Sequence, residues 1–231
     1  MTGAATRREP ARHDLLLLTR DGWTSLAERE PALAATAWFP VWAARDFPVM
    51  RRRKQPGDDP VLLPVAVALP AAFGRARPGF QVGSADIAAV RRPPTLVEAL
   101  PMLPDPLRAR AIAVLAATGP TGPVPRLFGS AMWQAVTGLD HLHERSDLDL
   151  LWCLADAPDR RERIDRLLAA LAALDATAGA RLDGEIVLDD HRAVNWREIA
   201  APGEHELLVK TLDAVRMMSR TAFLAREPIP C

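Results

Sequence analysis

The sequence predicts an α+β protein in which a mixed β-sheet with flanking helices forms a C-terminal lobe, preceded by a small, β-rich N-terminal lobe. Residues 126–154 read as strand, tight turn, helix, loop and strand, and a helix and a further strand follow at residues 159–176 and 180–188. Sixteen of the 21 prolines lie between Pro31 and Pro125. This density excludes long helices and central strands over most of that region.

The N-terminal lobe is predicted to span residues 1–118, and residues 119–231 to form the C-terminal domain. The Gly- and Pro-rich stretch at 119–123 is the strongest linker signal in the chain. Within the N-terminal lobe, short strands are expected at residues 47–50, 61–69 and 81–82, a buried strand or helix start at 15–18, and helices at 25–35, 95–103 and 106–118. The last helix is predicted to bury Leu107, Ile112 and Leu115.

The composition is that of an ordinary globular protein, with 49% hydrophobic and 25% charged residues and a formal net charge of zero. A neutral chain does not indicate a polyanion-binding protein. Since no apolar run approaches the roughly 20 residues that span a bilayer, no membrane partner is expected and the protein is predicted to be cytoplasmic. Cys153 is expected to be a core thiol and Cys231 a tail thiol.

Two aspartates lie next to each other on one face of a predicted buried strand. Asp147 and Asp149 are two residues apart, and strand side chains alternate between faces, so both carboxylates are expected on the same side. Like charges at that distance repel unless a cation lies between them. Mg²⁺ is the natural candidate, because it takes oxygen ligands from one or two carboxylates together with substrate phosphates. The sequence therefore predicts that Asp147 and Asp149 bind magnesium, with two ions expected.

A Gly-Ser turn precedes the predicted helix that leads to these acids. Gly129 allows the backbone to approach a ligand closely, and Ser130 occupies the expected N-cap position of the helix. Free backbone N–H groups and the positive potential of a helix N-terminus suit a phosphate. Gly129 and Ser130 are therefore predicted to hold substrate phosphate. No thiolate or second histidine pair accompanies His141 and His143, so a zinc site is not predicted.

A Gly-Ser turn followed by Asp-x-Asp on the next strand resembles the nucleotidyltransferase fold of the DNA polymerase β type. A narrower resemblance spans most of the chain. It rests on G-S-A-M-W-Q-A-V-T-G-L, S-D-L-D-L-L, R-L-D-G-E, A-V-N-W-R-E and L-L-V-K-T, which begin at residues 129, 146, 181, 193 and 207. These motifs are similar to those of the phosphoribosyl-dephospho-CoA transferase family, also called the holo-acyl-carrier-protein synthases of malonate decarboxylase.

The superfamily resemblance implies a third carboxylate on the strand after Asp-x-Asp. Asp183 and Glu185 both qualify by position, and the sequence does not choose between them; ordinary polar residues on an edge strand are the alternative. Lys210 matches the family's L-V-K and is a candidate phosphate ligand, although a surface position explains it equally well. Residues 204–224, which include Lys210, are predicted to form a helix.

A run of basic residues in the N-terminal lobe offers a possible phosphate clamp. Arg51, Arg52 and Arg53 follow a short apolar run and precede a turn. Guanidinium groups bind phosphate through paired donors, so at least one of the three is a candidate ligand of a substrate triphosphate. A solvated hairpin arm is the alternative, in which positive charge discourages edge pairing.

The family resemblance, and not the residue spacing, implies the substrates. It implies that a serine of the apo acyl-carrier subunit of malonate decarboxylase attacks 2′-(5″-triphosphoribosyl)-3′-dephospho-CoA and that pyrophosphate is released. The N-terminal lobe is then expected to help dock the substrate or the carrier. Two alternatives stay open: a Mg²⁺-dependent nucleotidyl- or adenylyltransferase that acts on another acceptor, and a non-catalytic nucleotide-binding module. No nucleic-acid partner is expected.

Overall fold

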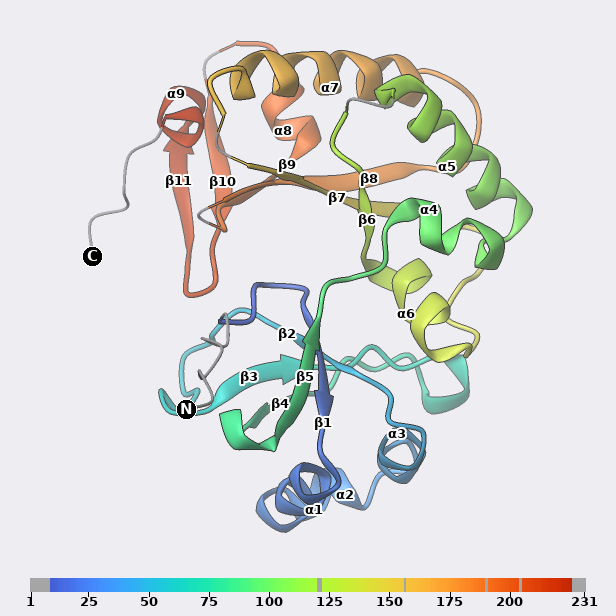
Figure 1. Cartoon of the computed structure of the whole chain (residues 1–231), viewed down its shortest axis with the longest axis vertical. Helices are drawn as coiled ribbons and strands as arrows, with labels where there is room; N and C mark the ends of the chain where they lie inside the picture. Colours follow the sequence, from blue (N-terminus) through green and yellow to red (C-terminus); the bar gives the residue numbers. More distant parts are fainter. Residues whose placement is uncertain (1–8, 120–121, 156, 190, 204, 226–231) are drawn as a thin grey trace, which may run out of the picture. The chain divides into compact units, whose positions relative to one another are not determined.

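The computed structural model describes residues 9–119, 122–155, 157–189, 191–203 and 205–225 (Figure 1). The chain forms two compact units. Unit 1 consists of Met1–Val67 and Pro78–Arg92, and unit 2 of Ala68–Arg77 and Pro93–Cys231. The boundary predicted after residue 118 falls inside unit 2, at the end of α5 (Asp105–Thr118), because this helix packs against α7 (Arg160–Asp175).

Unit 1 is built on a five-stranded antiparallel sheet with the order β4-β3-β2-β1-β5. Its strands are β1 (Leu15–Leu18), β2 (Val49–Arg51), β3 (Leu63–Ala66), β4 (Gly79–Val82) and β5 (Ile87–Arg91). Residues 15–18 are thus a strand, and the predicted β-rich character of this region is confirmed. The last strand was not predicted.

Short helices and aromatic side chains complete unit 1. The helices are α1 (Arg20–Arg29), α2 (Pro31–Ala34) and α3 (Phe39–Ala44), and a 3-10 turn lies at Ser84–Asp86. A further 3-10 turn at Ala71–Phe73 lies between β3 and β4 in sequence but belongs to unit 2. Thr19 caps α1 by accepting a hydrogen bond from Gly22 N, and Pro31 begins α2, where its missing N–H costs nothing. Trp23 packs edge-on against Phe39 at 5.3 Å between ring centroids.

Unit 2 contains a six-stranded mixed sheet with the order β11-β10-β9-β8-β7-β6. Its strands are β6 (Arg126–Leu127), β7 (Leu148–Leu154), β8 (Leu182–Leu188), β9 (Ala193–Asn195), β10 (Glu206–Lys210) and β11 (Val215–Ser219). The β7–β8 pair is parallel and the other pairs are antiparallel. The predicted α+β class with a mixed sheet is therefore confirmed.

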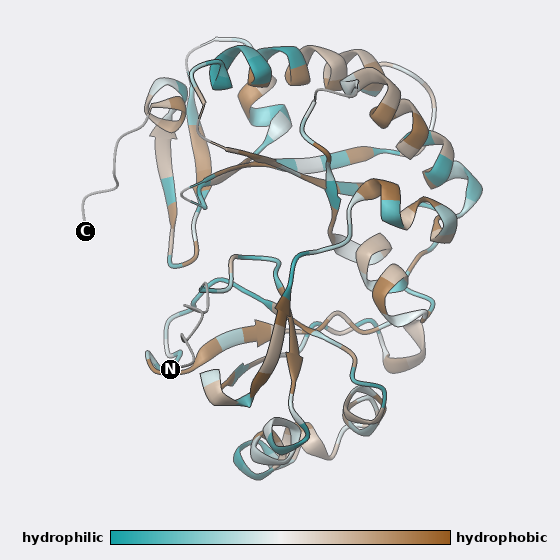
Figure 2. Ribbon diagram, viewed as in Figure 1, coloured by the Kyte–Doolittle hydropathy of each residue, from teal (hydrophilic) through white to brown (hydrophobic). Residues whose placement is uncertain are grey.

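The helices of unit 2 flank this sheet. They are α4 (Leu96–Ala99), α5, α6 (Gly129–Thr137), α7, α8 (Trp196–Ala200) and α9 (Arg220–Leu224), with a 3-10 turn at Leu100–Met102. Figure 1 shows α5, α7 and α8 on one side of the sheet, and α7 contacts both other helices. Hydrophilic residues are concentrated in the first turns of α7, and mostly hydrophobic residues follow (Figure 2). The buried stripe consists of Ile164, Leu167, Leu168 and Leu171.

The predicted helix at residues 204–224 is wrong: the described part of this segment forms the β10–β11 hairpin and the short helix α9. Burial along β10 has a period of two, with Leu207 and Val209 buried. The turn is closed locally, because Thr211 Oγ1 accepts hydrogen bonds from Asp213 N and Ala214 N. The hydroxyl of Thr211 therefore favours a turn where the apolar spacing alone favoured a helix.

Three predicted environments are also wrong. Cys153 is exposed, because it projects from the same face of β7 as Asp149, opposite to the face of the buried Trp152 and Leu154. Ile112 is 54% exposed, since α5 buries a face that includes Ala111 instead. The run of charges that begins the predicted helix at 159–176 favours a solvated position for Arg160, but Arg160 is buried, and its guanidinium donates a hydrogen bond to Leu224 O at 3.1 Å.

None of the described helices has the length and apolar character needed to cross a bilayer. Cys231 lies outside the described residues.

Candidate active site

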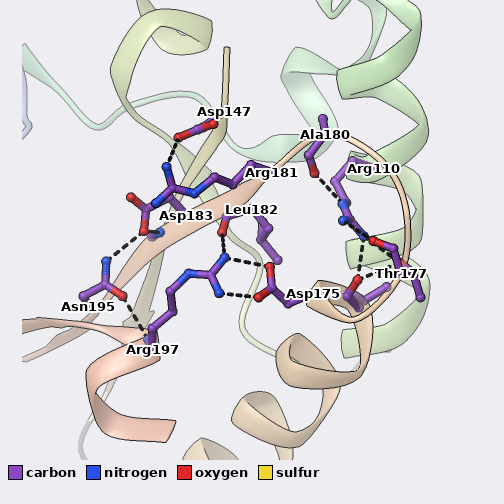
Figure 3. Close-up of polar contacts among 12 residues, drawn as sticks. Arg110, Asp147, Asp175, Thr177, Ala180, Arg181, Leu182, Asp183, Asn195 and Arg197 are labelled. Carbon is purple, nitrogen blue, oxygen red and sulfur yellow. Dashed lines mark hydrogen bonds and ion pairs between the residues drawn. The ribbon is translucent and has the colours of Figure 1, made fainter. Parts of the chain in front are cut away.

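The parallel β7–β8 pair positions the acidic side chains. Asp149, the second residue of β7, is in register with Asp183 of β8, so both side chains project from the same face of the sheet. Asp147 was predicted on the strand, but β7 begins one residue later. Leu148 N donates a hydrogen bond to Arg181 O at 2.8 Å, and Arg181 Nη1 reaches Asp147 Oδ2 at 3.2 Å (Figure 3). The structure thus places Asp147, Asp149 and Asp183 along the chain at the beginnings of β7 and β8.

Asp149 carries the strongest electrostatic signal of the site. The pKa of its carboxyl group is raised from 3.8 to about 7, chiefly by burial and then by the negative charges of Asp183 and Asp147, against smaller opposing effects of Arg77 and Arg181. Folding therefore places this carboxylate where its negative charge is disfavoured. A perturbed acid of this kind is typical of a functional site.

Gly129 begins α6 directly beside Asp149. Its φ of +64° lies in the left-handed region, and a Cβ atom at this position would collide with Asp149 Oδ2. Phe128 N donates a hydrogen bond to Asp149 O at 3.1 Å, which fixes the turn to β7. Ser130 was predicted to be the N-cap of α6, and this prediction is wrong. The N-cap is Phe128, and no side chain caps the helix. The first backbone N–H groups of α6 consequently have no side-chain cap.

Asp183 is held in place by a residue that the sequence did not single out. Asp183 Oδ1 accepts hydrogen bonds from its neighbour Gly184 N and from Asn195 Nδ2, each at 2.8 Å (Figure 3). Asn195 Oδ1 in turn accepts a hydrogen bond from Arg197 N and caps α8. Asn195 stands within the A-V-N-W-R-E motif, which was the only signal in the sequence that included it.

Glu185, the other candidate third carboxylate, lies two residues beyond Asp183 on β8, in register with Leu151 of β7. Its side chain is 7% exposed and accepts a hydrogen bond from Lys210 Nζ at 2.9 Å. Lys210 lies on β10, and not on a helix, so this ion pair links two strands of the sheet. The predicted role of Lys210 as a phosphate ligand stays a prediction, and its ammonium group is paired with a carboxylate in this structure.

The three arginines of the predicted phosphate clamp lie in unit 1. Arg51 is buried and donates a hydrogen bond to Pro64 O at 3.1 Å. Arg52 forms two hydrogen bonds with Asp58, at 2.7 and 2.8 Å. Arg53 is half-buried. The guanidinium groups of Arg51 and Arg52 therefore have structural partners, and the phosphate-binding role of this run stays a prediction.

A second polar network fixes the segment that leads into β8. Arg197 forms an ion pair with Asp175 and donates a hydrogen bond to Leu182 O at 2.8 Å (Figure 3). Arg110 of α5 donates to Ala180 O at 2.7 Å and to Thr177 Oγ1 at 2.9 Å. These bonds anchor the chain on either side of Arg181. Sequence reasoning missed them, because contacts so distant along the chain leave no local pattern.

The aspartates fit a magnesium ion without forming a preassembled cage. Within the ranges that the structure describes, no group of three or more His, Cys, Asp or Glu side chains is gathered to hold a metal. Mg²⁺ commonly takes only one or two carboxylates and keeps positions for water and substrate oxygens. The repulsion between like charges that raises the pKa of Asp149 would be relieved by a cation beside it.

His141 is buried, and burial lowers its pKa to about 4. Its Nε2 atom lies 3.1 Å from Thr137 Oγ1.

A mixed sheet that presents three aspartates beside a left-handed glycine defines an acidic site of a class suited to phosphate chemistry. Two family models cover most of the chain. The phosphoribosyl-dephospho-CoA transferase MdcG N-terminal domain matches residues 11–93, and the C-terminal domain of the same transferase matches residues 95–221. The chain therefore belongs to the phosphoribosyl-dephospho-CoA transferase family, and the resemblance noted in the sequence is confirmed.

Curated relatives agree with this assignment. A phosphoribosyl-dephospho-CoA transferase of Bradyrhizobium diazoefficiens is 34% identical, over 94% of each chain. Proteins of the same name from Xanthomonas campestris pv. campestris and Xanthomonas euvesicatoria pv. vesicatoria are 35% and 33% identical, over 91% of this chain and 95% of theirs. No solved structure gives a significant match.

Proposed function

We propose that the protein transfers the phosphoribosyl-dephospho-CoA group from 2′-(5″-triphosphoribosyl)-3′-dephospho-CoA to a serine of the apo acyl-carrier subunit of malonate decarboxylase. Pyrophosphate is the second product. Family membership supports the transferred group. The observation that carries the proposal is Asp149, whose half-buried carboxyl group feels the negative charges of Asp183 and Asp147 and lies beside Gly129.

The proposal includes a nucleotidyltransferase-type fold for unit 2. The strand order supports it: Gly129 starts a helix between β6 and β7, and the acids stand at the start of β7 and β8. In this arrangement Asp183 is the third carboxylate. It faces Asp149 in register, whereas Glu185 lies further along the strand and is paired with Lys210.

In the proposed reaction, the serine Oγ attacks the α-phosphorus and the bond from this phosphorus to the bridging oxygen of the β-phosphate breaks. Asp183 accepts the serine proton. The hydrogen bonds from Gly184 and Asn195 fix its Oδ1 atom and thereby orient the carboxylate for this role. The uncapped N–H groups at the start of α6 hold the departing pyrophosphate. Positioning and charge neutralisation supply most of the catalysis.

Asp147 and Asp149 are the proposed magnesium ligands, with Asp183 beside them. When bound, Mg²⁺ supplies charge neutralisation for the phosphate oxygens. Arg181, which holds Asp147 in this structure, keeps that carboxylate oriented toward the start of β7.

Transfer to apo carrier protein tests the proposal and is read as a mass increase by mass spectrometry, with Mg²⁺ and the triphosphoribosyl donor. We expect complete modification by the wild type and none by Asp149→Asn, with the serine-to-alanine carrier as the acceptor control. If the wild type instead adds a nucleotide from ATP to an acceptor, the fold proposal stands and the substrate is wrong. If neither transfer occurs, the protein is a binding module and the proposed function is wrong.

A further inference from the structure

A large cavity in unit 2 opens beside the aspartates and is not accounted for by phosphoryl transfer. Its volume is about 980 Å³, within the range of pockets that bind cofactor-sized molecules. One wall comes from the beginning of α5, including Pro106, Leu107 and Ala109, and the opposite wall from the loop before β7 and the turn before β8. Asp147 and Arg181 also line it, so the cavity and the candidate active site share two side chains.

Most of the surface of the cavity is apolar, although charged side chains such as Asp140 and Glu144 also line it. Pro104, Leu142 and Ala180 add to the aliphatic surface. Among the described lining residues the imidazole of His143 is the only aromatic ring, so the cavity offers little surface on which a nucleobase could stack. Gln134 Oε1 already accepts hydrogen bonds from His141 N and Leu142 N, which leaves its Nε2 group as a donor.

We infer that this cavity binds the pantetheine arm of the dephospho-CoA moiety, an inference that rests on the proposed function. The arm is a flexible aliphatic chain with two amides. A mostly aliphatic cavity with an amide donor is better suited to this arm than to adenine. Because Asp147 belongs to both sites, an arm in the cavity leaves the triphosphate directed toward Asp149 and Gly129.

Arg145 extends this assignment to the diphosphate that joins the arm to the adenosine. It lines the cavity, its side chain is exposed, and its guanidinium forms no ion pair within the described part of the chain. A guanidinium of this kind beside a mostly apolar cavity is suited to a diphosphate. The non-reacting arm thereby adds binding energy that is the same in the ground state and in the transition state.

The decisive variant fills the cavity without touching the acids. Ala109 is exposed on α5 and lines the cavity, whereas Ala116 is exposed on the same helix and does not. With the full donor, we expect Ala109→Trp to raise KM about tenfold or more and to leave kcat within about twofold, the pattern of lost ground-state binding. Ala116→Trp should match the wild type. A wild-type KM for Ala109→Trp would overturn the inference.

A truncated donor distinguishes the arm from the nucleotide. With 2′-(5″-triphosphoribosyl)-AMP, which lacks the pantetheine arm, the wild type and Ala109→Trp should have the same KM. An equal rise of KM for both donors would place the nucleotide in the cavity and overturn the inference. If Ala109→Trp lowers the melting temperature, Ala109→Leu, a smaller filling change, provides the comparison.

Equilibrium binding separates this inference from the proposed function, because it requires no transfer. By titration calorimetry, wild type should bind 3′-dephospho-CoA about tenfold or more tightly than ADP, which keeps the diphosphate and lacks the arm, and Ala109→Trp should bind the two ligands equally. If this difference is found but no transfer occurs, the proposed reaction is wrong and the cavity assignment stands. If transfer occurs and the wild type binds the two ligands equally, the cavity assignment is wrong.

Discussion

At the scale of one residue, the charged form of Asp149 lowers the stability of the folded protein. Its pKa is raised from 3.8 to about 7, so between these pH values the folded protein holds a proton that the unfolded chain has lost. Stability of the metal-free protein therefore falls as the pH rises from about 4 to about 7. A shift of this size corresponds to at most about 4 kcal/mol, and partial solvation lowers the value.

Asp149→Asn should remove this pH-dependent cost. In urea unfolding with EDTA, we expect the variant to be more stable than the wild type at pH 8, and the difference in unfolding free energy to shrink toward pH 5. Exposed Asp140→Asn is the control, with a difference that does not change in this way. A gap between Asp149→Asn and wild type that is independent of pH would contradict the assignment of the raised pKa to Asp149.

Gly129 can be tested against a glycine at the other end of the same helix. Gly129 and Gly138 have φ values of +64° and +68°, but a Cβ atom would meet Asp149 only at the first position and nothing within 4 Å at the second. Gly138→Ala should cost about 1 kcal/mol from backbone strain alone. Gly129→Ala should cost clearly more and abolish transfer, because Asp149 must move. Equal unfolding free energies for the two variants would show that Gly129 is not in contact with the carboxylate.

At the scale of elements, β9 and α8 meet at Asn195, which serves two neighbours at once. Its Oδ1 caps α8 and its Nδ2 binds Asp183. Asn195→Ser retains a capping oxygen but loses the donor to Asp183, so activity should fall about tenfold with little loss of stability. Asn195→Ala should lose about 1 kcal/mol more, through the cap. Urea unfolding and transfer kinetics of both variants separate the roles, and full activity of Asn195→Ser would exclude the positioning of Asp183.

Periodicity predicted most elements of unit 2, and it failed where a turn is made by a side chain. The helix over 159–176 and the strand over 180–188 follow from apolar spacing and are α7 and β8. The β10–β11 hairpin does not, because Leu207 and Leu208 fit either period and the deciding contacts are made by the Thr211 hydroxyl. The exposure of Cys153 depends on which part of each face of β7 is covered, and the local sequence cannot reveal this.

The candidate site was predictable to the extent that it is local in sequence. Spacing alone indicated Asp147 and Asp149, and the glycine turn indicated Gly129. The proposed choice of Asp183 over Glu185 rests on the register of β7 against β8, together with the position of Lys210 on a strand, and neither is visible in the local sequence. Asn195 and Arg110 act through contacts that only the tertiary fold creates.

At the scale of the whole molecule, a cation bound at the aspartates should stabilise the folded chain. A ligand that binds only the folded state at 100 times its dissociation constant contributes about 2.7 kcal/mol. We expect Mg²⁺ to raise the melting temperature of the wild type by a few degrees and that of Asp149→Asn by much less, with Na⁺ at matched ionic strength as control. An equal rise in both proteins would show that magnesium binds elsewhere.

The short segment Ala68–Arg77 determines how this molecule can be divided. It is inserted in sequence between β3 and β4 of unit 1, yet it belongs to unit 2, so no single cut in the chain separates the units. A gene fragment that starts at Pro93 would encode every strand of the mixed sheet but would omit Arg77, whose charge lowers the pKa of Asp149. A shortened enzyme of this kind would hold its central carboxyl group protonated up to a higher pH than the intact chain does.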